Sequence, residues 1–450
     1  MPTQNAAITA RVRLAEGAIV TDSYPIRPVR PEEFPAFRFV DDHAFHVTRL
    51  LPERANLADR LFEPDRSLAA FDPASGAFDA PEAAPAQDGD IVGTAGAFSF
   101  QMSVPGAVLP VAGVSYVSVL PTYRRRGILR SLMRRQLADI AARGEEPVAA
   151  LWASEAPLYG RYGYGPAGSV AVFTFGRGEG ALTAGVDESL TLQLVSPGKA
   201  AADLAKVYDT VRPARPGFFA RDEAWWDKVL FDHASDRGGF GPLRCVLAAD
   251  EAGPRGYALY RAQGLWDAAE YLPAGKIVVR ELIAADPAAG AALWRDLLSR
   301  DLVTEVLAVN RPVDDPLIFQ LADPRRARPH TGDGLWVRLI DLSRALSSRA
   351  YSCAVDVVLQ VSDELLTSNA GRWRLQVADP MSAAGISCTR TTDPADIALD
   401  VRELGAAYLG GTRLGALAAA GLVRELRPGT LGRLSAAMSW DASPWCPAIF

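Results

Sequence analysis

Apolar positions in the first third of the chain follow the patterns of buried strands and of an amphipathic helix. Residues 91–100 and 108–120 are strand-like, and the second stretch is so continuously apolar that it predicts a central strand. Apolar side chains then recur at helical spacing, at Leu129, Leu132, Met133, Leu137 and Ile140. Gly144 ends this helix, and residues 147–153 form another buried strand. The order strand, helix, strand predicts a βαβ unit.

The segments before this unit are less regular. Residues 27–54 combine charges with a helical pattern of apolar residues, at Phe34, Phe37, Val40 and Phe45. Residues 71–90 are rich in Ala, Pro, Gly and Asp, which predicts a surface loop or insertion.

The middle of the chain shows a similar order again. A helix is expected at 218–231, and paired strands at 244–249 and 256–261. A second strand–helix–strand unit follows, at 276–284, 288–300 and 304–309. An internal repeat would produce this order, but so would any α/β chain, and the order alone does not separate the two interpretations.

The last third places strands before helices, which is typical of an α+β domain. A short helix is expected at 341–350, then strands at 355–361 and 373–377, then helices at 403–408, 414–420 and 431–438. A chain of 450 residues has room for two to four domains. The changes of pattern predict three, at 1–172, 173–328 and 329–450.

Composition excludes several classes of protein. Hydrophobic residues make up 49% and charged residues 22%, as in ordinary globular chains, and the net charge of −6 gives no general attraction to nucleic acid or anionic membranes. The four cysteines are far apart and form no CxxC pair, which argues against a disulfide framework or a structural zinc site and favours the cytoplasm. We expect no membrane span and no signal peptide, because no apolar run is long enough and charged residues occupy the N-terminus.

The turn after the strand 108–120 carries the clearest chemistry. It reads Arg124-Arg125-Arg126-Gly127 and leads directly into the amphipathic helix. Backbone N–H groups in the first helical turn have no partners within the helix, and the helix dipole adds partial positive charge there. Gly127 lets the backbone approach a ligand closely, and the arginines supply charged donors. A solvated arginine cluster is the alternative, but the strand before and the helix after favour a pyrophosphate site.

Two further features lie after the strand 147–153. Gly163 to Gly168 match a GxGxxG pattern, but Pro166 interrupts it and the strand-like residues 170–175 follow, so we interpret it as a turn. Tyr159 lies at the carboxyl end of a strand of the βαβ unit, where ligands gather. Its phenol, with a pKa of about 10, can donate a proton, although an aromatic packing role is favoured by the position alone.

At this point the sequence resembles a known family. The run from Val117 to Leu129 resembles the coenzyme A motif of GNAT acetyltransferases. Together with Ser154 to Gly165 and the terminal Pro444 to Phe450, it is similar to the Eis (enhanced intracellular survival) family over essentially the whole chain. The resemblance implies a fold of two tandem GNAT-like α/β domains, the second degenerate, followed by an α+β domain like sterol carrier protein.

The resemblance also implies roles for individual residues. Acetyl-CoA would bind through Val117 and Val119 at the pantetheine arm, through the pyrophosphate site, and near Ser154; the pyrophosphate site would comprise Arg124, Arg125, Gly127 and Ile128. Tyr159 would be the general acid for the CoA thiolate, and the terminal carboxylate on Phe450 the general base. No metal is implied.

Departures from the family pattern bear on the second domain and on the acceptor. Residues 284–287 lack an Arg-x-x-Gly turn and include Asp286, which would repel a pyrophosphate, so we expect one CoA site per chain. Family members that acetylate polycationic aminoglycosides use an acidic pocket, whereas this chain has the apolar Val47 and Ile449. Asp41 and Asp42 are upstream and face elsewhere in this interpretation. Phe45 and Trp152 would line the amine pocket, with ordinary core packing as the alternative.

Two functions follow from these observations. The first is an acetyl-CoA-dependent N-acetyltransferase that acts by direct transfer on primary amines, either aminoglycoside-like or lysine-like. The alternative is a scaffold protein that binds a lipid or apolar ligand in its third domain; an intact turn at Arg124 to Gly127 favours the enzyme. The resemblance further implies a homo-oligomer, expected to be a hexamer.

Overall fold

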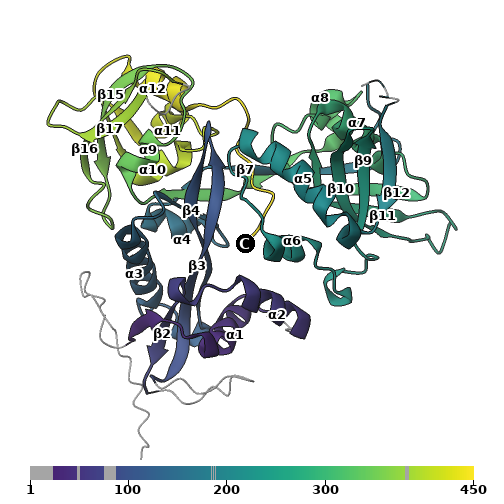
Figure 1. Cartoon of the computed structure of the whole chain (residues 1–450), viewed down its shortest axis with the longest axis horizontal. Helices are drawn as coiled ribbons and strands as arrows, with labels where there is room; N and C mark the ends of the chain where they lie inside the picture. The colour runs from purple at the N-terminus through teal and green to yellow at the C-terminus, as the bar shows by residue number, and fades with distance from the viewer. Residues whose placement is uncertain are drawn as a thin grey trace, which may run out of the picture.

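Three β-sheets organise the chain. The structure, a computed structural model, describes residues 24–47, 51–74, 88–183, 185, 187, 189–380 and 385–450. Two of the sheets have seven strands and the third has five. Figure 1 shows the second sheet on the right and the third at the upper left, with the long strands β3 and β4 of the first sheet rising between them. The first and third parts therefore lie together, and the second extends away from them.

The first sheet has the strand order β1-β2-β3-β4-β5-β14-β6. Its strands are β1 (Ile26–Pro28), β2 (Leu68–Asp72), β3 (Asp90–Val104), β4 (Ala107–Val119), β5 (Val148–Trp152), β6 (Gly165–Pro166) and β14 (Leu335–Leu339). Its helices are α1 (Phe34–Ala44), α2 (Pro52–Leu61), α3 (Ile128–Arg143) and α4 (Ala156–Tyr159). The predicted βαβ unit is confirmed as β4-α3-β5, because β4 and β5 pair in parallel. Gly144 ends α3 with a left-handed φ of 66°.

The second sheet has the order β13-β7-β12-β11-β10-β9-β8. Its strands are β7 (Ser169–Gly176), β8 (Thr191–Val195), β9 (Arg244–Asp250), β10 (Gly253–Gln263), β11 (Gly275–Ala284), β12 (Val303–Pro312) and β13 (His330–Asp333). Its helices are α5 (Ala201–Val211), α6 (Glu223–Leu230), α7 (Pro287–Leu298) and α8 (Leu317–Gln320). The antiparallel pair β10–β11, followed by α7 and by β12 parallel to β11, repeats the order of β3, β4, α3 and β5. The interpretation as an internal structural repeat is therefore confirmed.

The third sheet has the order β17-β16-β15-β18-β19. Its strands are β15 (Val355–Ser362), β16 (Gly371–Val377), β17 (Ile386–Arg390), β18 (Ile397–Asp400) and β19 (Val423–Glu425). Its helices are α9 (Leu342–Ser347), α10 (Val401–Ala407), α11 (Leu414–Ala419) and α12 (Thr430–Met438). The α+β class is confirmed. The pattern missed β17, β18 and β19, which have five residues or fewer and too few periods to identify a strand.

Strands near residue 335 join the parts of the chain. β14 pairs with β5 and β6 of the first sheet, and β13 pairs with β7 at the edge of the second. Arg338 on β14 forms a buried ion pair with Asp363 at 2.7 Å, which ties the first sheet to the third domain. The sheets thus cross the boundaries predicted from pattern, since β7 spans residue 172 and β14 follows residue 328. The domain boundaries after residues 172 and 328 therefore stay predictions.

The first third differs from its prediction in two places. The helix predicted within 27–54 is α1, which ends at Ala44, so that Phe45 is 52% exposed, and a second helix, α2, begins at Pro52. The predicted loop at 71–90 begins with the last residues of β2, and residues 75–87 lie outside the part that the structure describes. Among the described helices, none is long and apolar enough to cross a membrane.

Candidate active site

The two central strands of the first sheet separate near their carboxyl ends. β4 pairs with β5 only from Val111 to Gly113, and beyond Gly113 it keeps β3 alone as a strand partner. The β3–β4 register shifts between Thr94 and Gly96, which gives β4 an extra residue and places Tyr116 at a φ of 53°. A bulge bends its strand and redirects side chains. Val117 and Val119, half-buried on this stretch, lie on the opened edge of β4.

The turn before α3 has the features of an anion site. Gly127 is the N-cap of α3 with a φ of 84°, no side chain caps the helix, and a Cβ at Gly127 would meet nothing within 4 Å. Arg124 and Arg125 are exposed, and their side chains make no hydrogen bond or ion pair with any described residue. Arg126 instead donates to the Tyr24 hydroxyl and the Thr122 carbonyl. The arginines therefore divide into two available for a ligand and one used by the fold.

Tyr159 lies on the β5 side of the opening. Its side chain is buried, its ring meets Tyr164 edge-on at 6.2 Å, and Ser154 nearby is exposed. Burial raises the pKa of Tyr159 above its ordinary value, although the Ser154 side chain acts in the opposite direction. The phenol is therefore protonated at neutral pH and can act as a proton donor.

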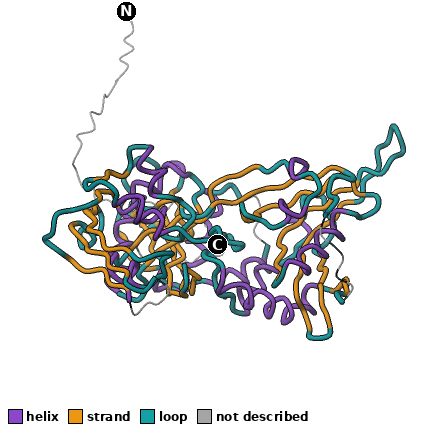
Figure 2. Tube along the Cα trace, turned by 90° about the horizontal axis from the view of Figure 1, so that it is seen from above, coloured by secondary structure: helices purple, strands orange, loops and turns teal. Residues whose placement is uncertain are grey.

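The last residues of the chain lie between the first and second parts (Figure 1, Figure 2). Trp152 Nε1 donates to the carbonyl of Ala448 at 2.9 Å, and Asn310 Nδ2 donates to the carbonyls of Cys446 and Pro447 at 3.2 and 3.3 Å. The Phe450 ring contacts the ring of Phe100, with centroids 5.0 Å apart. A Cβ added to Gly113 would lie 3.3 Å from that ring. Phe450 thus packs where β4 parts from β5.

Two neighbouring cavities lie where the first and second parts meet. One, of about 590 Å³, is lined from the first part by Asp41 and Asp42 of α1 and by Tyr116 of β4. The other, of about 460 Å³, is lined by Trp152 and Ile449. Both share Lys228, Phe231, Arg261 and Arg280 of the second part. We refer to the two cavities together as the interdomain cleft.

The predicted pocket residues divide in this structure. Trp152 lines the cleft and is held by its bond to Ala448. Phe45 is not among the lining residues of either cavity, because α1 ends one residue before it. The sequence interpretation placed Asp41 and Asp42 away from the acceptor pocket. In the structure, both residues line the cleft. Asp41 follows the buried Phe37 by four residues and therefore lies on nearly the same face of the helix.

Asp41 has an unusual environment. Its carboxylate accepts a hydrogen bond from Ser118, the residue between Val117 and Val119. Burial raises the pKa of Asp41 to about 6, and the nearby Asp42 adds to the rise, while the Ser118 bond opposes it. A carboxyl group that titrates near neutral pH therefore lies beside the opened end of β4.

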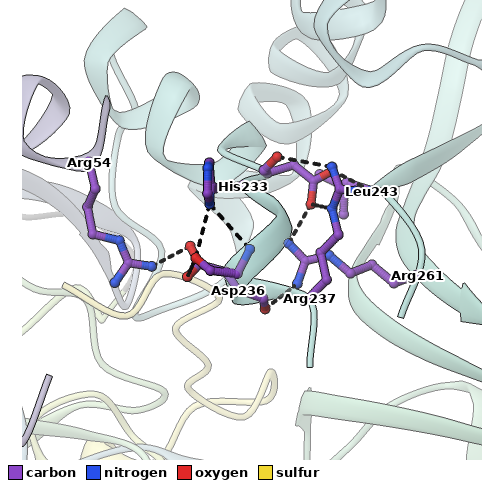
Figure 3. Close-up of polar contacts among 8 residues, drawn as sticks. Arg54, His233, Asp236, Arg237, Leu243 and Arg261 are labelled. Atoms are coloured by element: carbon purple, nitrogen blue, oxygen red, sulfur yellow. Dashed lines mark hydrogen bonds and ion pairs between the residues drawn. The ribbon is translucent and has the colours of Figure 1, made fainter. Parts of the chain in front are cut away.

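The cations of the cleft were missed by the sequence interpretation. Lys228, Arg261 and Arg280 come from α6, β10 and β11, and no local motif links them. Figure 3 shows the surroundings of Arg261, which lies beside Arg237, and the nearby ion pair between Arg54 of α2 and Asp236. Arg261 and Arg237 both pair with Asp232. The Arg54–Asp236 pair fastens α2 of the first part to the second part.

The second part has no comparable turn. Asp286 caps α7 by accepting from the N–H groups of Ala288 and Ala289, both at 3.0 Å, and pairs with Arg255. Arg311 donates to the carbonyl of Leu282 on the end of β11 that no longer pairs with β12. The chain itself thus occupies positions that a cofactor would need. No group of three or more His, Cys, Asp or Glu among the described residues is arranged to hold a metal ion.

Comparisons with known proteins agree with this geometry. Residues 25–167 and 217–339 each match the GNAT acetyltransferase domain, and residues 342–447 match the sterol carrier protein domain. An uncharacterized N-acetyltransferase of Streptomyces coelicolor is 45% identical, over 80% of this chain and 86% of its own. N-acetyltransferase Eis of Mycobacterium tuberculosis is 36% identical, over 78% of this chain and 84% of its own.

A solved structure supports the same assignment. The crystal structure of Eis1 from Mycobacterium abscessus has a TM-score of 0.77 and 34% identity, and the match covers 95% of this chain and all of that one. The opened β4–β5 pair and the uncapped α3 are present in the domain that the first match covers. The chain is therefore an Eis-like GNAT N-acetyltransferase, with two GNAT domains followed by a sterol carrier protein domain.

Proposed function

We propose that this chain transfers an acetyl group from acetyl-CoA directly to a primary amine, using one site in its first domain. The observation that carries the proposal is the convergence of the opened edge of β4, the uncapped start of α3 and the buried Tyr159. Acetyl-CoA supplies an activated acetyl thioester. The groups at this site fit acetyl-CoA. Its pantetheine arm needs an unpaired strand edge, and its pyrophosphate needs exposed N–H groups and arginines without other partners.

The binding roles follow from these positions. The backbone of Val117 and Val119 would hold the pantetheine arm, as in a strand pair. Arg124, Arg125 and the backbone of Gly127 and Ile128 would hold the pyrophosphate. Ser154, which is exposed just after β5, would contact acetyl-CoA near Tyr159. The capped start of α7 supports a single CoA site per chain.

Two groups would move protons. Tyr159 Oη would donate a proton to the departing thiolate, and its raised pKa means that the phenol is neutral before the transfer. A terminal carboxylate on Phe450 would accept the amine proton, directly or through water. The contact of the Phe450 ring with β4 at Gly113 supports this role, since it keeps the end of the chain beside the strand opening.

Thiol release from acetyl-CoA, measured over a panel of primary amines, tests the proposal. Tyr159→Phe should lower kcat by about 100-fold, the usual contribution of general acid catalysis, with little change in the KM for acetyl-CoA. Tyr162→Phe is the matched control, because Tyr162 is a neighbouring buried tyrosine outside the proposed machinery. Equal values of kcat for Tyr159→Phe and the wild type would show that Tyr159 only packs in the core and is not the general acid.

The terminal carboxylate has its own test. A short extension after Phe450 should abolish turnover and leave CoA binding intact, whereas the same extension at the N-terminus should have no effect. Full activity with the C-terminal extension would disprove the role of Phe450 as the base.

The alternative of an apolar-ligand scaffold has less support. The cavity beside β15 and β16, of about 370 Å³, is lined in part by Asp356, Gln376 and Arg433, which do not suit a lipid. The interior of the third domain is occupied by buried side chains such as Leu375, Tyr408 and Leu434. These features favour the enzyme.

Assembly and location remain proposals. A homo-oligomer, expected to be a hexamer from the resemblance, is supported by exposed apolar side chains at Trp266, Tyr271 and Leu272 between β10 and β11. Light scattering after size exclusion tests it, and a monomeric mass would contradict it. A cytoplasmic location is supported by the four free cysteines.

A further inference from the structure

The interdomain cleft is lined by charged side chains of both signs from each domain. Asp41 and Asp42 line it from α1, next to the opened end of β4. Lys228, Arg261 and Arg280 line it from the second domain, and all three border both cavities. A molecule in this cleft therefore meets two carboxyl groups beside the opened end of β4 and three cations on the second domain, together with the other charged lining residues.

Most of the charged groups here already have partners. Arg54 pairs with Asp236, Arg261 pairs with Asp232 at 2.8 Å, and Arg38 lies 3.6 Å from Asp59. Glu281, the acidic residue of the smaller cavity, pairs with the buried Arg221 at 2.7 Å and accepts from the Tyr257 hydroxyl at 2.6 Å. Glu281 is thus already engaged by groups behind the cleft.

Lys228 and Arg280 are different. Neither side chain makes an ion pair or hydrogen bond with another described residue, and the Lys228 ammonium lies 4.6 Å from the centroid of the Trp225 ring. Burial, with a contribution from Arg54, lowers the pKa of Lys228 to about 8. Burial and the nearby Arg261 lower the pKa of Arg280. Lys228 is half-buried and Arg280 is exposed, and neither has a counter-ion among the described residues, so an anion bound between them would gain charge-assisted contacts with both.

The backbone directs Arg280 into this position. The β10–β11 register shifts between Leu259 and Tyr260, so that Arg280 is the extra residue of β11. Tyr116 occupies the equivalent bulge of β4 in the first domain, and both residues line the larger cavity. Bulges redirect side chains next to functional sites. In the second domain the bulge therefore serves the acceptor side of the cleft, although that domain has no CoA turn.

We infer that the acceptor is an amine that carries an anionic group at a distance from its amino group. Its amino group lies at the Asp41 and Asp42 end, beside Ser118 and β4, and its anionic group lies between Lys228 and Arg280. The inference rests on the proposed function, since it assigns the acceptor of that same site. A polycation is disfavoured, because it would place positive charge against these two cations.

The test compares acceptors that differ only in charge. Thiol release from acetyl-CoA is measured with ω-amino acids, from aminobutanoate to aminooctanoate, and with the ω-amino amides of the same lengths. For at least one length, the wild type should have a kcat/KM about tenfold higher for the acid than for the amide, as expected for charge-assisted contacts. Lys228→Gln and Arg280→Gln should each remove most of this preference while retaining turnover of the amides.

Folding and surface charge have separate controls. Lys276→Gln removes a cation from the same strand as Arg280, but one that pairs with Glu305 on the surface, and it should keep the preference. The Tm of Lys228→Gln should stay close to that of the wild type, because the substitution removes a half-buried charge that has no ion-pair partner among the described residues.

The remaining outcomes separate this inference from the proposed function. Amides acetylated as well as the acids, or an unchanged preference in both cleft variants, would overturn the anionic acceptor and leave the acetyltransferase intact. If diamines or aminoglycosides were acetylated while neither the ω-amino acids nor the ω-amino amides were accepted, the anionic acceptor would also be overturned and the acetyltransferase left intact. No thiol release with any amine would refute the proposed function, and the inference with it.

Discussion

Ser118 donates a hydrogen bond to the carboxylate of Asp41, and this bond joins α1 to β4 at the stretch where β4 has parted from β5. The two flanking residues, Val117 and Val119, are those proposed to hold the pantetheine arm. Asp41 also lines the cleft proposed to hold the acceptor. A single contact therefore connects the cofactor side of the site to the acceptor side.

The first prediction concerns the pH dependence of stability. The pKa of Asp41 is about 6 in the folded protein, above its ordinary value of 3.8, because burial disfavours the charged form. The stability that the proton provides is fully present below pH 3.8 and is lost as the pH rises through about 6. Between pH 4 and pH 7 the wild type should lose about 2 kcal/mol more unfolding free energy than Asp41→Asn. Urea unfolding at both pH values measures this, and parallel losses would contradict it.

The second prediction separates the three arginines of the turn. Arg124→Ala and Arg125→Ala should each raise the KM for acetyl-CoA about tenfold with little change in kcat, because each removes a charge-assisted contact to phosphate. Arg126→Ala should have a smaller effect on KM, since that side chain bonds to Tyr24 and Thr122. Steady-state kinetics at constant ionic strength are required, because salt screens these contacts. A larger increase in KM for Arg126→Ala than for the other two variants would show that Arg124 and Arg125 do not make the main contacts to the phosphates.

The third prediction concerns the second GNAT domain. Asp286→Ala should lower the unfolding free energy by about 1 kcal/mol, because α7 loses its N-cap. Asp286→Asn should retain most of that stability, since asparagine caps equally well. Isothermal titration with CoA should give one equivalent per chain in the wild type and in both variants. Two equivalents in any of them would disprove the single-site assignment.

The fourth prediction concerns the last residues of the chain. Asn310 has a φ of 48° and donates to the carbonyls of Cys446 and Pro447. Asn310→Gly suits the positive φ and removes only the side-chain amide. The loss of its hydrogen bonds should lower the free energy that holds the last residues in place by about 1–2 kcal/mol. Carboxypeptidase should then remove the last residues faster, and kcat should fall. Asn310→Asp, which cannot donate, should behave in the same way; wild-type rates in both variants would exclude this anchor.

The secondary structure of the two βαβ units could be predicted because each helix and strand has its own periodicity. Gly127 and Arg124 were identifiable for the same reason, since they lie next to each other between a strand and a helix. Asp41 was misjudged, because its partner Ser118 lies on another element. Phe45 stays a prediction; the apolar pattern that suggested it continues beyond the point where α1 ends.

The sequence by itself determined the family, the two strand–helix–strand units and the position of the turn from Arg124 to Gly127, because each depends on neighbouring residues. Only the tertiary structure decided which side chains share the cleft. Lys228, Arg261 and Arg280 come from three elements of the second domain, and Asp41 comes from the first. The tertiary structure also decided that β14 completes the first sheet, beside β5. These relationships depend on contacts between distant parts of the chain, which local patterns of hydrophobic and polar residues do not encode.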